Sequence, residues 1–337
     1  MSIQTSAPTR IDLAGGTIDI WPLYLFHDGA QTLNAAISLR ARARIDARDD
    51  QRVVLRSEDT NRSVDVADWS QLRPDGDLRL LRLLTHWFLQ ASTNGNRRTG
   101  LMLTTRSESP AGAGIAGSSA LNVAVCAALA EFTGRRDDPE ALLEIAMNVE
   151  AQTINVPTGV QDYRPAMYGG IAAIELGVTG VRRAPLDVDP RELERRIVLC
   201  YTGEPRNSGT NNWEIVKRHL DGDRFVFDCF ERIRDTAVAM RAALARSDWD
   251  AVGTAIAAEW DNRKRLAPGV TTPAIDRLID LAGKAGATAA KVCGAGGGGC
   301  VFCYGPPDRS GAIAAALTGG GARLLPFSIE RHGLTRG

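Results

Sequence analysis

The sequence predicts an α+β fold, because segments with strand periodicity and segments with helix periodicity are mixed along its 337 residues. Apolar and polar residues alternate with period two in Ala41–Ala47, which is typical of a strand. Apolar residues fill nearly every position of Ser118–Phe132, which predicts a buried helix. A connection over Gly177–Asp187 divides the chain, so we expect two domains, residues 1–180 and 181–337.

The first half of the chain is expected to combine several strands with three helices. Asp138 supplies a capping side chain and Pro139 suits a first helical turn, so a helix should begin there. The stretch Asn155–Gly170 is rich in turn residues and is expected to lack regular structure. The expected strands are Ile11–Leu13, Leu33–Ile45, Arg52–Arg56, Ser63–Ala67, Gly100–Thr105 and Ile171–Leu176, and the helices are Asp77–Ala91, Ser118–Phe132 and Asp138–Gln152.

The second half is expected to hold several helices between about residues 209 and 285. The charged segment Glu259–Arg265 is typical of a solvated helical face, and contact with a ligand site is the alternative. The stretch Thr202–Asn212 is rich in Ser, Asn and Gly, which predicts a loop and leaves contact with a substrate open. The expected strands are Ile197–Tyr201, Thr288–Val292, Cys300–Tyr304 and Arg323–Phe327, with a helix near Ser310–Leu317.

Composition excludes several classes of protein. Basic and acidic residues both number 40, so the net charge is zero and a nucleic-acid partner is not indicated. No apolar run reaches the roughly 18 residues that a membrane span needs, and the N-terminus lacks the pattern of a signal peptide. With 44% hydrophobic and 24% charged residues, a cytoplasmic globular protein is expected, as a monomer or a homodimer.

Cysteine and histidine indicate neither a disulfide framework nor a metal site. The six cysteines are scattered, and we expect them to be reduced thiols of the core. Cys300 and Cys303 form a C-x-x-C, for which a redox or metal role is the alternative, but no second cysteine pair accompanies them. The four histidines show no metal-ligand spacing; they are His27, His86, His219 and His332.

The most informative motif is the glycine-rich segment Pro110–Ala120, which follows a predicted strand and opens a predicted helix. Its glycines let the backbone fold tightly and approach a ligand closely. Ser118 and Ser119 occupy the positions where helix caps belong, so free N–H groups and the positive end of the helix dipole face the loop. That arrangement is an anion site, and a phosphate fits it. The segment matches neither a Walker A loop nor a dinucleotide fingerprint.

A second glycine run, Lys291–Cys300, lies between two predicted strands. Four consecutive glycines lose much conformational entropy on ordering, so they suit a place where backbone lies against a ligand or another loop. A flexible hairpin tip is the alternative. A third motif, Ala7–Asp19, is a strand that leads into a Gly-Gly turn. Arg10 in this apolar strand needs a partner, and Asp19 beyond the turn is placed to bind a ligand.

Together, and in this order, the three motifs resemble the GHMP kinase superfamily, which includes galactokinase, homoserine kinase and mevalonate kinase. Ala7–Asp19 is similar to the Pro-x-Arg-(aliphatic)-x-Leu-Ala-Gly-Gly-x-x-Asp start of the bacterial D-glycero-D-manno-heptose 7-phosphate kinases and of the fucokinase branch. Val160–Asp162 followed by Met167–Gly170 is similar to their Gln-Asp and Gly-Gly segment. The resemblance covers most of the chain. It implies a two-domain fold, with a ribosomal protein S5 domain 2-like N-terminal half and a ferredoxin-like C-terminal half.

The resemblance also implies roles for individual residues. Asp162 matches the catalytic aspartate that faces the acceptor hydroxyl, and Arg10 matches an arginine that lies near it. Ser119 and Glu150 match the residues that bind Mg²⁺ alongside ATP. The residues implied to bind substrate are Asp19, Gly16, Thr17, Gly169 and Gly296, and those implied to bind the nucleotide are Gly112, Ala113, Gly114, Ile115, Ala116, Gly117, Ser118 and Ser119.

Some positions depart from the family pattern. The phosphate loop usually reads Gly-Leu-Gly before its serines, whereas this chain has Ile115-Ala116-Gly117, which adds a methyl group next to the phosphates. The first motif reads Gly-Gly-Thr-Ile-Asp where the heptose kinases have Gly-Gly-Gly-Thr-Asp, and Trp21 follows where smaller or polar residues are usual. These positions should line the acceptor pocket, so they bear on the acceptor more than on the kinase chemistry.

The function implied is an ATP-dependent kinase of a sugar or sugar phosphate, with D-glycero-D-manno-heptose 7-phosphate as the first acceptor to consider. Another sugar, of the galactose or fucose type, or a non-sugar alcohol such as mevalonate is an alternative. Asp19 discriminates between these, because a carboxylate accepts sugar hydroxyls whereas an acidic substrate needs a cation. A sugar-binding regulator that lacks catalysis is a further alternative.

Overall fold

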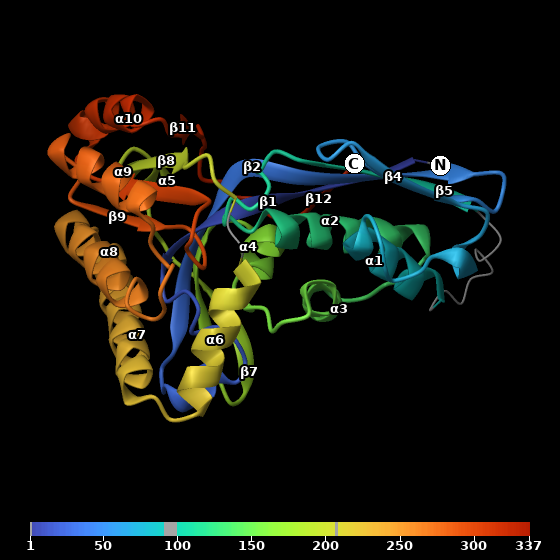
Figure 1. Cartoon of the computed structure of the whole chain (residues 1–337). Coiled ribbons are helices and arrows are strands. Elements are labelled where there is room, and N and C mark those ends of the chain that lie inside the picture. The colour runs from blue at the N-terminus through green and yellow to red at the C-terminus, as the bar shows by residue number, and fades with distance from the viewer. Residues whose placement is uncertain (1, 91–99, 206–207) are drawn as a thin grey trace.

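The first of two β-sheets is built mainly from the N-terminal half of the chain (Figure 1). A computed structural model describes residues 2–90, 100–205 and 208–337, with the side chains of 208–211 excepted. Within that part of the chain, eight strands form this sheet in the order β12-β1-β2-β5-β3-β4, with β6 and β7 added alongside β2. The strands are β1 Ser2–Ala14, β2 Gln31–Arg48, β3 Val53–Ser57, β4 Arg62–Val66, β5 Gly100–Ser107, β6 Ile171–Gly177, β7 Gly180–Pro185 and β12 Thr335–Arg336.

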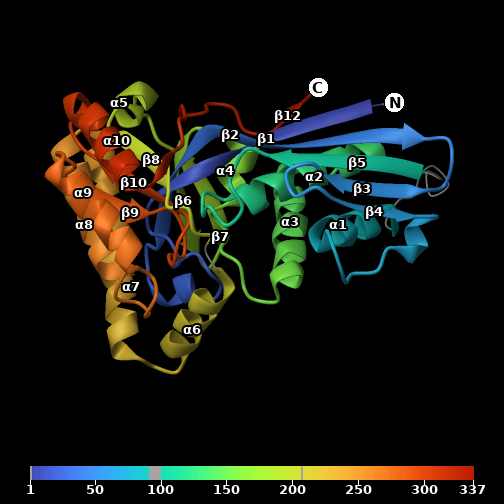
Figure 2. The same cartoon turned by 45° about the horizontal axis from the view of Figure 1, so that its top comes forward.

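Helices of the N-terminal half pack against one face of this sheet, as Figures 1 and 2 show. The central helix α2 (Gly117–Phe132) is buried along most of its length, as its apolar sequence predicts. Its Val123 and Leu129 belong to the same core cluster as Leu103 of β5. The helices around it are α1 Arg79–Gln90, α3 Pro139–Ile154 and α4 Tyr163–Tyr168, and two short 3₁₀ helices are η1 Leu23–Phe26 and η2 Trp69–Gln71.

The second sheet has four strands within the described residues, in the order β11-β8-β10-β9, and all of its pairings are antiparallel. Its strands are β8 Ile197–Tyr201, β9 Ala289–Val292, β10 Cys300–Tyr304 and β11 Arg323–Leu324. Figure 1 shows α7, α8 and α9 next to this sheet and α6 separate from it. The helices are α5 Pro190–Glu194, α6 Ser208–Leu220, α7 Arg224–Ala245, α8 Trp249–Arg263, α9 Pro273–Lys284 and α10 Ser310–Gly319, with η4 at Pro307–Arg309.

The two halves share a core around the C-terminal end of β1 and the N-terminal end of β2. Ile11 and Leu13 of β1 belong to one buried cluster with Phe302 of β10. The last strand, β12, returns to pair with β1. Strand β7 pairs with β6 and extends the first sheet to Pro185. The two glycine motifs and the turn after β1 therefore meet between the sheets.

The predicted α+β class is confirmed. The predicted connection at Gly177–Asp187 is wrong, because it contains β7; that strand is partly exposed and carries no apolar alternation to reveal it. The turn-rich stretch Asn155–Gly170 also contains the short helix α4, and β1 begins at Ser2, well before Ile11. The predicted end of the first helix, Ala91, lies outside the described residues.

All six cysteines are buried, as expected for thiols of the core. Among the described residues, no helix is both long and apolar enough to cross a membrane.

Candidate active site

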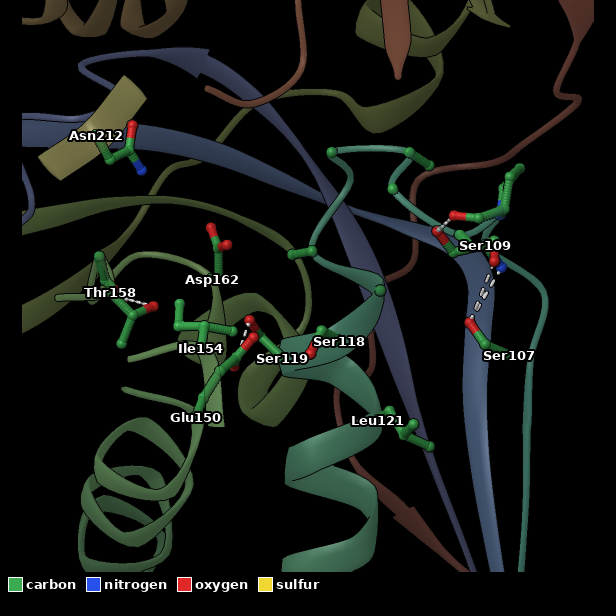
Figure 3. Close-up of a pocket in the computed structure, with 18 of the residues that line it drawn as sticks. Ser107, Ser109, Ser118, Ser119, Leu121, Glu150, Ile154, Thr158, Asp162 and Asn212 are labelled. Carbon is green, nitrogen blue, oxygen red and sulfur yellow. Dashed lines mark hydrogen bonds between the residues drawn. The ribbon is translucent and has the colours of Figure 1, made fainter. Parts of the chain in front are cut away.

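A cavity of about 370 Å³ lies at the N-terminus of α2, against the glycine-rich loop (Figure 3). Gly112 and Gly114 have φ angles of 66° and 80°, which side chains rarely permit. Ala116, at the helix N-cap, also has a positive φ of 61° and makes no side-chain capping bond. The N-terminal N–H groups of α2 and its dipole thus remain directed at the cavity, which suits an anion.

Two oxygen-bearing side chains meet at the inner end of this cavity. The Ser119 hydroxyl donates to the Glu150 carboxylate at 3.0 Å, and the Tyr163 hydroxyl donates to the same oxygen at 2.7 Å. Burial raises the pKa of Glu150, while the hydrogen bonds from Tyr163 and Ser118 oppose that rise. The loss of hydration that raises the pKa also means that a cation here would stabilise the ionised carboxylate.

The residues present fit a magnesium ion in their chemistry. Mg²⁺ prefers oxygen ligands and usually takes only one or two carboxylates, with water and nucleotide phosphates completing its shell. Ser119 and Glu150 supply one hydroxyl and one carboxylate side by side. Within the described residues, no cluster of three or more His, Cys, Asp or Glu side chains forms a metal cage. Such an ion would therefore depend on the nucleotide for most of its ligands.

Asp162 lies just before α4 and is held by Arg10 from β1. Arg10 donates from Nε and Nη2 to one Asp162 oxygen, at 3.0 and 2.6 Å. Its Nη1 donates to the carbonyls of Gly114 and Cys293, at 2.9 and 2.8 Å. Burial alone lowers the pKa of Arg10, but Asp162 and Asp12 outweigh it and the net shift is upward. One buried guanidinium thus ties Asp162 to both glycine-rich loops.

A second, smaller cavity of about 50 Å³ lies on the other side of Asp162. Asp162, Gly159 and Asn212 line both cavities, and Figure 3 shows Asp162 pointing into the space below Asn212. The full lining of the second cavity is Arg10, Asp12, Thr17, Asp19, Ile20, Gly159, Gln161, Asp162, Asn212, Arg263, Gly294 and Ala295. A group in one cavity and a group in the other would therefore meet at Asp162.

Asp19 is a buried carboxylate of the second cavity. It accepts a hydrogen bond from the Gln161 backbone N–H at 3.0 Å, and Gly159 is a glycine because a Cβ there would lie 2.1 Å from an Asp19 oxygen. Burial, and then the charge of Asp162, raise the pKa of Asp19 to about 7. Asp19 therefore changes charge near neutral pH.

The structure brings most of the expected site residues together. Seven of the eight expected nucleotide residues line the larger cavity. The exception is Ile115, whose side chain lies in the core and whose carbonyl accepts from the Arg10 backbone N–H. Of the expected substrate residues, Thr17 and Asp19 line the smaller cavity.

The remaining three glycines lie outside the lining of both cavities. Gly16 packs beneath the smaller cavity, where a Cβ would lie 2.1 Å from an Asp12 oxygen. Gly169 faces the backbone of Arg331–Gly333, and Gly296 faces the backbone of Val270. Gly169 and Gly296 allow close packing against backbone, and Gly16 allows close packing against side chains. Such packing produces the same sequence signal as a ligand contact.

Sequence reasoning missed Asp12 and kept contact with a ligand site only as the alternative for the segment that holds Arg263; both residues line the smaller cavity. The prediction of a solvated face at Glu259–Arg265 holds for Asp261 and Lys264 but is wrong for Glu259 and Arg263, which are 0% and 2% exposed. Glu259 and Arg263 are four residues apart in α8, so they lie on the same face of the helix. That face packs toward β1. Asn212 comes from the stretch for which substrate contact stayed open, and its Oδ1 has no hydrogen-bond partner among the described residues.

The larger cavity ends on the N–H groups of α2, and it shares Asp162 with a second cavity. This arrangement suits the transfer of a phosphoryl group to an alcohol. The chain belongs to the GHMP kinases: the family's N-terminal domain matches residues 80–170 and its C-terminal domain matches residues 240–322. The protein is therefore a phosphotransferase with an alcohol group as acceptor, and its family implies the use of ATP.

Several known proteins resemble the chain over its whole length. It is 28% identical to the D-glycero-alpha-D-manno-heptose 7-phosphate kinase of Campylobacter jejuni, over 99% of this chain and 98% of the relative. It is 24% identical to the mevalonate kinase of Thermococcus sibiricus, over 99% and 98%. The crystal structure of a D-glycero-D-manno-heptose 1-phosphate kinase from Bacteriodes thetaiotaomicron has a TM-score of 0.81 at 24% identity and covers 99% of this chain and 98% of its own.

Proposed function

We propose that this chain transfers the γ-phosphate of ATP to a hydroxyl of a sugar or sugar phosphate, with Asp162 as the catalytic residue. The observation that carries the proposal is the place of Asp162 at the junction of the two cavities, fixed by two hydrogen bonds from Arg10. Phosphoryl transfer depends on positioning and charge neutralisation more than on covalent chemistry. Asp162 orients the acceptor hydroxyl and accepts its proton as the phosphoryl group is transferred.

The larger cavity would hold the nucleotide, with its phosphates against the loop and the start of α2. Ser119 and Glu150 would hold Mg²⁺, which neutralises phosphate charge when bound. The cationic side chain nearest the junction is Arg10, and it is already engaged by Asp162 and by two carbonyls. The helix N-terminus, together with an ion held by Ser119 and Glu150, would therefore take the role that a lysine has in many other nucleotide sites.

The smaller cavity would hold the acceptor. Its volume of about 50 Å³ has room for only a few water-sized groups, so it would receive the reacting hydroxyl and its neighbours. The first acceptor to test is D-glycero-D-manno-heptose 7-phosphate, because a full-length relative is named for that substrate. Asp19 supports a sugar over mevalonate, since a carboxylate of a substrate would be repelled by it at alkaline pH.

The acceptor class is tested by ADP release with a panel of four compounds and MgATP. The panel is D-glycero-D-manno-heptose 7-phosphate, D-galactose, L-fucose and mevalonate. We expect a sugar, with the heptose phosphate first, to give the highest kcat/KM. Turnover of mevalonate alone would replace the sugar assignment. Tight binding of a sugar and ATP without any ADP would favour a non-catalytic regulator.

The role of Asp162 is tested by Asp162→Asn, which keeps the size of the side chain and removes its charge. Turnover should fall by about 10²- to 10⁴-fold while ATP still binds. The matched control is Asp280→Asn, which removes an exposed aspartate paired with Lys284 on α9 and should leave turnover unchanged. Undiminished turnover in Asp162→Asn would overturn the mechanism.

A further inference from the structure

Four charged side chains form a buried cluster behind the smaller cavity, and we call them the charge tetrad. They are Asp12 of β1, Glu259 and Arg263 of α8, and Lys291 of β9, and their exposures are 1%, 0%, 2% and 0%. Two carboxylates face two cations, so the tetrad is neutral as a whole. Burying four charges is expensive unless each is closely paired and hydrogen-bonded. The length of each contact therefore shows whether each charge is well paired.

The contacts around Asp12 are long. Lys291 Nζ lies 3.4 Å from Asp12 Oδ1, and Arg263 Nη1 lies 3.5 Å from Asp12 Oδ2. A charge-assisted hydrogen bond of this kind usually spans about 2.7–2.9 Å. Asp12 Oδ1 has no hydrogen-bond partner among the described residues. A buried carboxylate with such loose partners still lacks the donors that its charge requires.

Asp12 and Arg263 line the acceptor cavity, whereas Glu259 and Lys291 do not. The tetrad thus has one side against the cavity and one side in the core. Hydroxyl groups of a ligand are hydrogen-bond donors, so a sugar in the cavity would offer a donor to the Asp12 carboxylate. Glu259 has no such opportunity, although its Oε2 also lacks a hydrogen-bond partner in the described part of the chain.

The tetrad also joins the three segments that frame the cavity. Arg263 Nη2 donates to the Gly294 carbonyl at 2.6 Å, which fixes the second glycine run. Glu259 accepts from the Gly15 backbone N–H at 3.1 Å, which fixes the turn after β1. Lys291 Nζ donates to the Leu13 carbonyl at 3.4 Å. Arg263 is therefore bound on two sides and holds Asp12 at the cavity.

The cations of the cavity are already engaged. Arg10 is engaged by Asp162, Gly114 and Cys293, and Arg263 by Gly294 and Asp12. Among the described residues that line this cavity, no cation is left for a phosphate or carboxylate group. The groups that face Asp12 should therefore be hydroxyls, and a charged end of the acceptor should point out of the cavity.

We infer that Asp12 is a specificity-determining residue that accepts a hydrogen bond from an acceptor hydroxyl other than the reacting one, and that Arg263 positions it. The inference rests on the proposed kinase function and names which part of the acceptor its site recognises. Asp162 contacts the hydroxyl that reacts, and Asp12 selects an acceptor that carries a second hydroxyl nearby.

The test compares Asp12→Asn with Glu259→Gln, measured with MgATP and the four acceptors named above. Both variants remove one negative charge from the same tetrad without changing side-chain size, but only Asp12 lines the cavity. Asp12→Asn should raise the acceptor KM by about 10- to 100-fold, the usual worth of a charge-assisted hydrogen bond. The KM for ATP should change little, and Glu259→Gln should change the acceptor KM much less than Asp12→Asn does, because Glu259 does not line the cavity.

Equal effects of the two variants on the acceptor KM, or none from Asp12→Asn, would overturn the inference. If Asp12→Asn does not fold, the same comparison is made with two double variants in which the net charge of the tetrad is kept. These are Asp12→Asn with Lys291→Met and Glu259→Gln with Lys291→Met. If the wild type releases no ADP with any of the four, the proposed function fails, and calorimetry measures binding instead. Weaker binding to Asp12→Asn alone would then support the inference, and no binding to the wild type would overturn both.

Discussion

The two cavities that meet at Asp162 are built in different ways. The larger cavity, proposed for the nucleotide, has a volume of about 370 Å³ and takes nine lining residues from the segment Pro110–Ala120. The smaller cavity, proposed for the acceptor, has a volume of about 50 Å³, and its lining comes from segments as far apart as Arg10 and Ala295. The first presents mainly backbone groups and the start of a helix, whereas the second presents buried charged side chains. One surface suits a ligand common to a whole family, and the other allows selection.

This difference predicts how each side responds to mutation. Backbone N–H groups persist through most substitutions, so the nucleotide side should tolerate small changes in the loop. Buried charges depend on one another, and removing one leaves its partners uncompensated. The largest effects should therefore come from residues that serve the acceptor side or that join the two sides.

The largest effect is expected for Arg10→Met, which removes the link between the two cavities. Asp162 and the carbonyls of Gly114 and Cys293 lose their donors. We expect the free energy of unfolding to fall by about 3–5 kcal/mol, and turnover by about 10²-fold or more. Denaturant unfolding and ADP release measure the two effects.

The matched control for this prediction is Arg42→Met, in which an exposed arginine loses its pairing with Glu108. An exposed pair contributes at most about 1 kcal/mol, so stability and turnover should stay close to the wild type. Equal losses in the two variants would show that Arg10 has no special role.

The next largest effect is expected for Glu150→Gln, which tests the metal side of the nucleotide cavity. The amide can still accept from Ser119 and Tyr163, so the local packing should survive. The Mg²⁺ concentration for half-maximal activity should rise by about 10- to 100-fold, because the charge that attracts the ion is lost. The acceptor KM should change little. A Mg²⁺ dependence equal to that of the wild type would exclude Glu150 as a metal ligand.

Asp19→Asn is expected to raise stability and to weaken acceptor binding, because the buried carboxylate of Asp19 lowers the free energy of unfolding when it is ionised. Its pKa is raised to about 7 in the folded protein from an ordinary value of 3.8. The folded state therefore binds the Asp19 proton more tightly than the unfolded state does. The stability that this group contributes is fully present below about pH 4 and is lost as the pH rises to about 7.

Asp19→Asn should remove that loss. At pH 8 the variant should be more stable than the wild type by about 2 kcal/mol, less than the full linkage value because a buried amide also needs partners. The acceptor KM should rise by about tenfold, as a carboxylate that accepts sugar hydroxyls is lost. Denaturation curves at pH 4 and pH 8 measure the difference. A wild-type stability that is flat across this range would contradict the burial argument.

The smallest effect is expected for Ala116→Gly in the phosphate loop. Ala116 has a φ of 61°, which costs a residue with a Cβ roughly 1–2 kcal/mol, whereas glycine adopts it freely. Since glycine also loses more entropy on folding, we expect a net gain of about 1 kcal/mol or less. The KM for ATP should change little. A large rise in that KM would show that the methyl group contributes to nucleotide binding.

The same difference explains what could be predicted from the sequence. The phosphate loop is contiguous, and its glycines, its serines and the helix after them can be recognised in order. The roles of Asp162, Glu150 and Arg10 are implied by the resemblance to a family, and the structure places all three residues beside the loop. The glycines at 169 and 296 show the limit of this reasoning, since packing against backbone also requires glycine.

The acceptor side could not be predicted in the same way. Arg263 and Glu259 lie in a charged helical segment that the sequence alone makes look solvated. Only tertiary packing brings them next to Asp12 and Lys291. Arg263 and Asp12, for example, lie some 250 residues apart in the chain. Strand β7 was missed for a related reason, because its side chains are only partly buried and carry no apolar alternation.

The most direct test of the account is a crystal structure with a non-hydrolysable ATP analogue, Mg²⁺ and the best acceptor of the panel. We predict the γ-phosphate at the Ser119 end of the larger cavity and the acceptor in the smaller one. The reacting hydroxyl should lie about 2.6–3.2 Å from an Asp162 oxygen, between that oxygen and the γ-phosphate. An acceptor bound away from Asp162, with its hydroxyl facing another side chain, would contradict the account.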